Sequence, residues 1–145
     1  AGSAQDVALL AARMVEVVDW VAGRTNLTGL HTGLCAAGVA AAAALLAATR
    51  RPVQVAAVVA RNGRPDLAGA ELARVSVPTL LIVGGGDPQA VQWNRTAMLA
   101  LACEKRLEVV PGATQHFEEP GALEAMAHLA GAWLADRLAG GRARH

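Results

Sequence analysis

Two apolar stretches of β-forming residues constrain the fold of this chain more than any other feature. They are residues 53–60 (VQVAAVVA) and residues 79–83 (TLLIV), and a third, less apolar stretch follows at residues 106–110 (RLEVV). Nearly continuous apolar runs of this length are typical of strands buried on both faces, as in a parallel sheet that helices cover on two sides. The chain is therefore expected to form such a sheet.

Segments with helical spacing alternate with these strands and complete the pattern. Strand–helix alternation predicts a three-layer α/β fold, with a mostly parallel sheet of about four strands and helices on both faces. One domain is expected over residues 1–138, followed by a flexible basic tail at residues 139–145. The expected helices span residues 4–21, 36–49, 90–101 and 121–138, with a short helix near residues 70–74.

The stretch LTGLHTGLCAAGVAAAAALLAA (residues 27–48) reads as a strand from Leu27 to Thr32, a sharp turn over residues 33–37, and a helix. A strand, a tight turn of small residues and a helix make up the geometry of a nucleophile elbow, with the reactive residue at the tip of the turn. Cys35 would occupy that tip. A helix N-terminus and a nearby histidine favour the thiolate form of such a cysteine. Taken alone, Cys35 is better explained as a small apolar residue packed in a turn than as a nucleophile.

Further polar residues are expected at the carboxyl ends of the strands, where open α/β sheets bind ligands. The order Cys35, Asp87, His116 matches the chain order of nucleophile, acid and histidine in one class of catalytic triad. His116 would take the thiol proton and Asp87 would orient the imidazole, while the N–H of Ala36 would bind the oxyanion. The alternatives are ordinary: Asp87 as a helix N-cap and His116 as a loop residue.

Composition excludes several other classes of function. The net charge is +1, aromatic residues make up 3% of the chain, and tyrosine is absent. A nucleic-acid surface is therefore not expected. The apolar run at residues 33–48 is too short to cross a membrane. Cys35 and Cys103 form no disulfide or metal pattern, which favours a reducing, cytoplasmic environment and implies no metal.

Three segments resemble the dienelactone-hydrolase-like branch of the α/β-hydrolases, some members of which are fused to a phosphoribosyltransferase domain. They are AAVVARNGRPDLAG (residues 56–69), PTLLIVGGGD (78–87) and RLEVVPGATQHFEEPGAL (106–123). The resemblance implies a truncated α/β-hydrolase fold and hydrolysis of a small ester or lactone without a cofactor. It assigns the triad to Cys35, Asp87 and His116.

The chain also departs from that family. The G-x-S-x-G elbow is replaced by Gly33-Leu34-Cys35-Ala36-Ala37, and a second alignment puts Leu34 at the nucleophile position. The family reads G-A-T-H where this chain has His116 one residue later. These departures leave open a non-catalytic, pseudoenzyme role as an interaction or accessory domain.

The strands that precede this region in the family are missing, so residues 27–32 are expected at a sheet edge. We expect a second copy of the chain, as in a dimer, a separate N-terminal partner, or a rearranged element of the chain itself to cover that edge.

Overall fold

The computed structural model describes residues 4–24 and 31–143, the last four of these by backbone alone. Nine elements follow one another along the chain. They are α1 (Ala4–Ala22), β1 (Thr32–Gly38), α2 (Val39–Arg50), β2 (Val55–Gly63), the 3₁₀ segment η2 (Pro65–Arg74), β3 (Thr79–Gly84), α3 (Pro88–Ala100), β4 (Lys105–Val110) and α4 (Ala122–Ala143).

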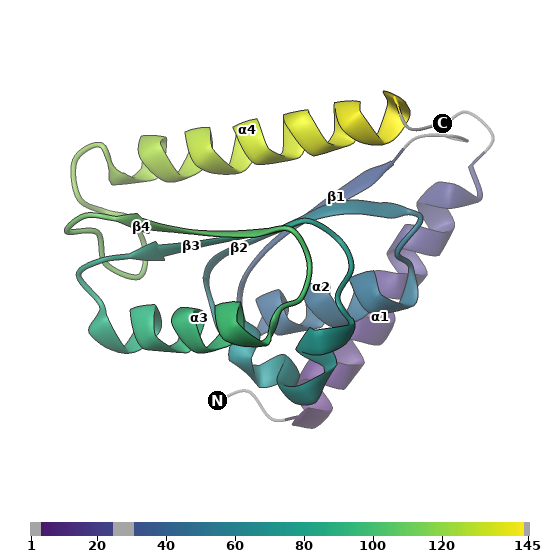
Figure 1. Ribbon diagram of the computed structural model, residues 1–145, viewed down its shortest axis with the longest axis horizontal. Helices are drawn as coiled ribbons and strands as arrows, with labels where there is room; N and C mark the ends of the chain where they lie inside the picture. Colours follow the sequence, from purple (N-terminus) through teal and green to yellow (C-terminus); the bar gives the residue numbers. More distant parts are fainter. Residues whose placement is uncertain (1–3, 25–30, 144–145) are drawn as a thin grey trace.

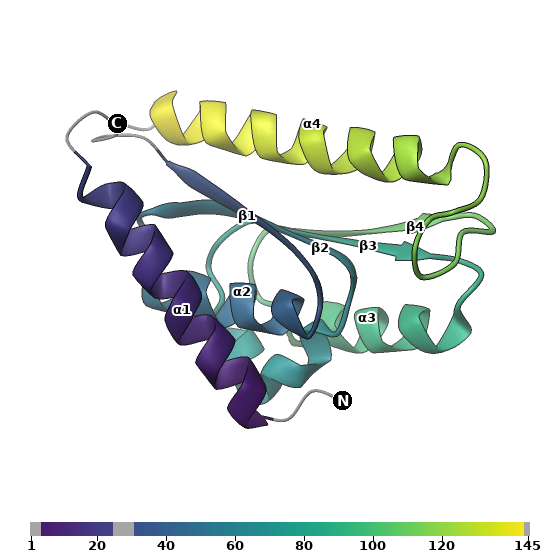
Figure 2. The ribbon, with the colours of Figure 1, turned by 180° about the vertical axis from the view of Figure 1, so that it is seen from behind.

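The four strands form one parallel sheet in the order β1-β2-β3-β4. Figures 1 and 2 show the sheet edge-on, with α4 along one face and α1, α2 and α3 beneath the other. This architecture confirms the predicted three-layer α/β fold. Because all four strands are parallel, their carboxyl ends meet along one rim.

Small residues allow the helix layer to approach the sheet closely. Seven residues of α2, six of them alanines, are buried, and every residue of β3 is buried. A Cβ on Gly63 at the end of β2 would lie only 2.3 Å from the Cβ of Ala41, so the first turn of α2 packs directly on the β2 backbone. The apolar sequence therefore produces a thin, tightly packed interior on the α2 side.

The predicted end of the first strand was wrong. Residues 27–30 lie outside the described residues, and β1 begins at Thr32, where the strand was expected to end. The predicted turn at residues 33–37 is extended strand, and α2 starts at Val39 rather than Ala36. Gly33 is small because α4 packs on it: a Cβ there would lie 2.7 Å from Cδ2 of Leu134. A packing glycine had been interpreted as a turn glycine.

Two other boundaries differ in ways that matter. The strand expected at residues 53–60 runs to Gly63, and α4 continues past residue 138 to Ala143, through most of the segment predicted as a tail.

Among the described helices, none combines the length and apolar character needed to cross a membrane.

Candidate functional site

The carboxyl rim of the sheet is defined by strand register. Gly38 pairs with Gly63 at the ends of β1 and β2, and Gly84 pairs with Val110 at the ends of β3 and β4. Glycines at three of the four strand ends leave the rim with few side chains of its own. The polar groups at this rim come mainly from the loops that leave it.

The sharp turn between β1 and α2 is made by Gly38 alone. Its backbone has φ 57° and ψ −138°, and Val39 already begins the helix. This conformation is costly for any residue with a Cβ, and it is the strained strand-to-helix geometry of a nucleophile elbow. The elbow frame is therefore Ala36-Ala37-Gly38-Val39-Ala40, and the position that carries a nucleophile in a hydrolase has no side chain here.

Cys35 and Ala36 lie inside β1, below the turn. Cys35 pairs with Val59, in the same row as Leu80 near the start of β3. Gly38 lies three residues further along the strand than Cys35, a distance of about 10 Å. The thiol of Cys35 is exposed, whereas Ala36 is buried in mid-strand. An elbow at Gly38 would offer the N–H of Val39, not that of Ala36, to an oxyanion.

Asp87 lies on the rim and caps a helix. Its Oδ1 accepts a hydrogen bond from the N–H of Ala90 at 3.1 Å, and Pro88 occupies the first turn of α3. An aspartate followed by proline is a favourable start for a helix, because the carboxylate satisfies an N–H that has no partner within the helix. The capping role that was an alternative for Asp87 is thus present in the structure.

His116 lies in the loop between β4 and α4 and is exposed. The N–H of Phe117 donates to the carbonyl of Thr114 at 3.1 Å, which places Gln115 and His116 at the centre of a tight turn. Phe117 is 2% exposed and has a positive φ of 53°. Its ring anchors the turn in the core on the α4 side, and the imidazole stays in solvent.

Asn62, which was not predicted as a site residue, joins this loop to the sheet. Its Nδ2 donates to the carbonyls of Thr114 at 3.1 Å and Gln115 at 2.6 Å, and its Oδ1 accepts from the N–H of Gly84 at 2.9 Å. One amide therefore connects β2, β3 and the histidine loop. Asparagine also tolerates the φ of 41° found here better than most residues.

Two further contacts hold the same loop. A Cβ on Gly84 would lie 2.2 Å from the carbonyl oxygen of Ala113, so the loop rests directly on the end of β3. The carboxylate of Glu119 accepts from the hydroxyl and the N–H of Thr114. These bonds, the side-chain one first, lower the pKa of Glu119 from its usual value. The loop is thus held at both ends.

The rim brings Asp87 and His116 to the same end of the sheet but does not join them. Within the described part of the chain, no hydrogen bond or ion pair links Asp87, His116 and Cys35. Cys35 and Ala36 lie within β1, before its carboxyl end at the rim. Gly38 and Asn62 are the rim residues that sequence reasoning missed. The sequence offers one signal for Gly38, its position one residue before the alanine run, but this does not distinguish an elbow glycine from a packing glycine.

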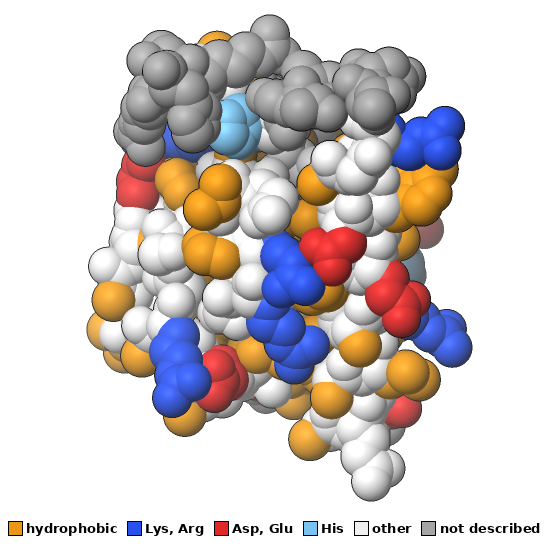
Figure 3. Space-filling view, turned by 90° about the vertical axis from the view of Figure 1, so that its right-hand side faces the viewer, with side chains coloured by type: hydrophobic (Ala, Val, Ile, Leu, Met, Phe, Trp, Pro, Cys, Tyr) orange, Lys and Arg blue, Asp and Glu red, His pale blue; other side chains and the backbone are white. Residues whose placement is uncertain are grey.

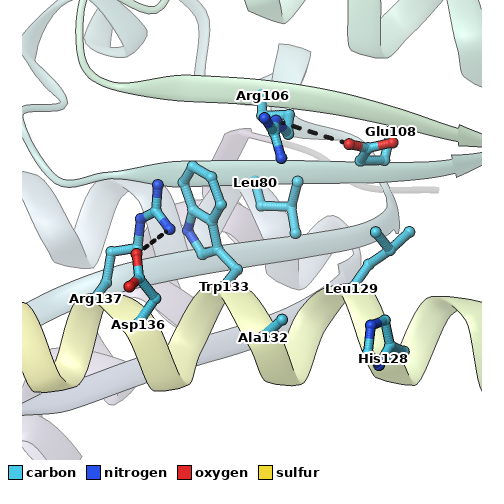
Figure 4. Close-up of a pocket in the computed structure, with 9 residues that line it drawn as sticks. All are labelled: Leu80, Arg106, Glu108, His128, Leu129, Ala132, Trp133, Asp136 and Arg137. Atoms are coloured by element: carbon cyan, nitrogen blue, oxygen red, sulfur yellow. Dashed lines mark hydrogen bonds and ion pairs between the residues drawn. The ribbon is translucent and has the colours of Figure 1, made fainter.

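A groove of about 290 Å³ lies elsewhere, between the sheet and α4 (Figure 4). Arg137 stacks on the Trp133 ring at 3.6 Å and pairs with Asp136 at 2.7 Å, and Arg106 pairs with Glu108 at 3.7 Å. Its charges therefore neutralise one another, and no predicted site residue lines it. The lining is Leu80, Arg106, Glu108, His128, Leu129, Ala132, Trp133, Asp136 and Arg137.

Two further kinds of site concern the described residues and the visible face in Figure 3, a metal cluster and a basic patch. Among the described residues, no group of three or more His, Cys, Asp or Glu side chains could hold a metal ion. On the part of the face in Figure 3 that grey atoms leave visible, basic and acidic side chains are interspersed. That face has no large patch of one charge for a polyanion to bind.

Comparison with solved structures supplies the family context. The chain superposes on a dienelactone hydrolase from Anabaena variabilis with a TM-score of 0.89 and 46% identity, covering 92% of this chain and 62% of that one. This chain is an α/β-hydrolase-like domain related to dienelactone hydrolase. A monoacylglycerol lipase from Paleococcus ferrophilus shares the fold at a TM-score of 0.65 and 13% identity, covering 86% of this chain and 75% of the lipase.

Relatives known from sequence are much longer. Two Mycobacterium tuberculosis proteins, from strains CDC 1551 and H37Rv, are each 47% identical over 135 residues, which is 93% of this chain, and each is called a "putative phosphoribosyl transferase". The chain spans about 30% of their length. No protein-family model matches the chain.

Proposed function

We propose that this hydrolase-like domain is a non-catalytic accessory domain, a pseudoenzyme that keeps the scaffold of an α/β-hydrolase without its nucleophile. The observation that carries the proposal is Gly38. It has the backbone geometry of the elbow and occupies the position from which a serine or cysteine would attack. Without a side chain there, no covalent acyl intermediate can form at the tip of the elbow.

The surrounding residues support the same proposal. Asp87 uses its carboxylate to cap α3, and His116 extends into solvent without a carboxylate partner among the described residues. A catalytic histidine needs a partner that fixes its tautomer and a nucleophile within hydrogen-bond reach. The scaffold residues of the rim, in contrast, are fully engaged: Asn62 and Gly84 hold the loop in place. These contacts fix the backbone of the rim, and none of them serves to transfer a proton.

A second proposal, hydrolysis of a small ester or lactone, is favoured by the exposed thiol of Cys35. In that reaction the sulfur attacks the carbonyl carbon and the alcohol leaves. His116 would carry the thiol proton to the alcohol, and water would then cleave the thioester. The position of Cys35 in mid-strand argues against this route, because the thiol lacks both the elbow and the helix N-terminus that activate a nucleophile.

Hydrolysis of p-nitrophenyl acetate separates the two proposals. We expect no multiple turnover above the buffer rate for the wild-type chain, and the same result for Cys35→Ala. Cys103→Ala is the matched control, because Cys103 is the other free thiol. Turnover that is abolished by Cys35→Ala and retained in Cys103→Ala would establish the hydrolase and end the pseudoenzyme proposal. A single stoichiometric release of p-nitrophenol is acylation of a surface thiol and does not count as turnover.

A further inference from the structure

β4 is an outer strand of the sheet, and among the described residues it pairs only with β3. The carbonyls of Glu104 and Val110, at its two ends, accept hydrogen bonds from backbone N–H groups of the neighbouring β3 segment. Because backbone direction alternates along a strand, the N–H and C=O groups of Lys105, Leu107 and Val109 face away from β3. They present a regular row of donors and acceptors with which another strand can pair.

The neighbouring elements leave room beside β4. Figure 1 looks onto this side of the sheet, with α4 above β4 and α3 below it. α4 packs chiefly on β2, and the groove lined by Arg106 and Glu108 lies between α4 and β4 (Figure 4). The loop that follows β4 turns back over the sheet, where Asn62 holds it. A strand added about 4.8 Å outside β4 therefore lies where the described chain leaves space.

The side chains of β4 are complementary to a second, antiparallel copy of the same strand. The strand reads KRLEVV (residues 105–110), and Arg106 and Glu108 point to the same face (Figure 4). When two copies run antiparallel about a twofold axis at Leu107, Arg106 of each copy lies directly opposite Glu108 of the partner subunit. These two residues form a non-hydrogen-bonded pair, the type of cross-strand pair in which side chains come closest, and opposite charges there stabilise a sheet.

The backbone selects the same register. It places Leu107 opposite Leu107 and Lys105 opposite Val109, so each outward-facing N–H and C=O group of these three residues gains a partner. Sliding one strand by two residues would instead oppose two Arg106 side chains or two Glu108 side chains. Sliding it by one residue would turn outward groups against groups that already bond to β3. Charge and hydrogen bonding therefore favour one register.

Lys105 does not block this edge, although a lysine on an outer strand often prevents pairing. Its ammonium donates to the carbonyls of Met98 and Leu101, each at 2.6 Å, at the C-terminal end of α3, where a cation is favourable. Val109, which lies opposite Lys105 of the partner subunit in this register, is 39% exposed. The apolar stem of that lysine can cover it.

We propose that β4 is a dimerisation strand, through which two copies of this chain join their four-stranded sheets into one continuous sheet. The interface is isologous, since the same residues contribute from both sides. α3 packs beneath β3 and β4, so the two α3 helices come to lie side by side beneath the paired strands. Their separation is roughly 10 Å, or two strand spacings, which is close to the distance at which helices pack.

The other outer strand of the described sheet, β1, lacks this complementarity. It reads TGLCAAG and carries no charged side chain that could select a register for a second copy. The proposed dimer goes beyond the accessory role and does not depend on it, because β4 pairs in the same way whether or not the elbow at Gly38 is catalytic.

Charge reversal tests the cross-strand pair. In a dimer of Arg106→Glu, or of Glu108→Arg, the four side chains that meet at the twofold axis all carry the same charge. Each variant is expected to raise the dimer dissociation constant, measured by analytical ultracentrifugation, by on the order of tenfold or more, because like charges oppose each other at two places. Mixing the two variants restores opposite charges between chains, so native mass spectrometry should find a one-to-one heterodimer.

The mixture separates contact between chains from contact within one chain, because the ion pair between Arg106 and Glu108 of the same chain is lost in both variants. Arg74→Glu is the matched control: Arg74 pairs with Glu71 at 3.8 Å on η2, and its reversal should leave the dissociation constant unchanged. Single variants as dimeric as wild type, or a mixture that stays monomeric, would overturn the proposal.

Amide exchange followed by NMR locates the interface in the wild-type chain and needs no variant. At high protein concentration the N–H groups of Leu107 and Val109 are expected to be protected as well as those of Arg106 and Glu108, which face β3. On dilution to the monomer, only the first two should exchange faster, by on the order of tenfold. A chain that is monomeric at NMR concentrations, or a dimer that leaves Leu107 and Val109 fast, refutes the proposal.

Discussion

Substitution of Gly38 by alanine tests whether the elbow is strained as its geometry implies. With φ 57° and ψ −138°, the residue lies near a region that essentially only glycine occupies, and holding another residue there costs about 1–3 kcal/mol. A Cβ built on Gly38 meets no other heavy atom within 4 Å, so steric overlap adds nothing. The expected loss of about 1–3 kcal/mol therefore comes from the backbone alone.

The assay is urea unfolding monitored by tryptophan fluorescence, with thermal unfolding alongside. For a domain of this size, each 1 kcal/mol lowers Tm by roughly 2–4 °C, so Gly38→Ala should melt about 2–12 °C below wild type. Gly38→Ser should lose about the same, because strain and not side-chain chemistry dominates. Gly131→Ala is the control: this glycine lies inside α4 with open space around it, and helix propensity predicts a gain of about 0.5–1 kcal/mol.

A neutral or stabilising Gly38→Ala substitution would refute the reasoning. It would mean that residue 38 relaxes to an ordinary conformation in solution, so that the strained elbow is absent. The claim that Gly38 occupies the position of a lost nucleophile would then lose its geometric basis, and Cys35 would again be a candidate nucleophile.

Three further predictions concern the rim. Asn62→Ala should destabilise the domain by about 1–3 kcal/mol in urea and speed amide exchange at Gly84, because the carbonyl and N–H groups that it satisfies lose their partner; unchanged exchange would argue against the connection. Asp87→Ala should cost about 1 kcal/mol in the same assay, whereas Asp87→Asn should be nearly neutral, since either side chain caps a helix; equal losses would point to a role for the charge. In an NMR titration, the pKa of Glu119 should lie below the usual glutamate pKa. The ionised carboxylate therefore stabilises the fold at pH values above the usual glutamate pKa, and this stabilisation is lost as the pH falls through the lowered pKa of Glu119. Thr114→Val should raise the pKa of Glu119, and an unshifted value would exclude the hydroxyl as the cause.

The fold could be predicted from sequence because it depends on long apolar segments. The strands around Val58 and Leu81 must be buried on both faces, and few arrangements other than a helix-covered parallel sheet achieve this. The observed strands differ from the predicted ones only at their ends. The interior of the domain is thus encoded redundantly, by many residues that all require the same environment.

The elbow could not be located from the sequence, because it depends on single glycines that are required for different structural reasons. Gly33 is required by the approach of Leu134, and Gly38 by its own backbone angles. In the sequence both are simply glycines beside small residues. The role of Asn62 is still less visible, since its partners are carbonyls 52 and 53 residues away that exist only once the loop has folded.

The sheet order has a consequence for how the chain folds. Each strand pairs with the next strand in the sequence, so every crossover joins immediate neighbours and no strand must wait for a distant one. Parallel sheets usually fold slowly, because loop closure must precede pairing. Here each closure spans a single strand–helix unit, and a ribosome-bound chain can add β2, β3 and β4 in turn as they emerge. Among the described strands β1 is synthesised first, and each later strand pairs with the one synthesised just before it.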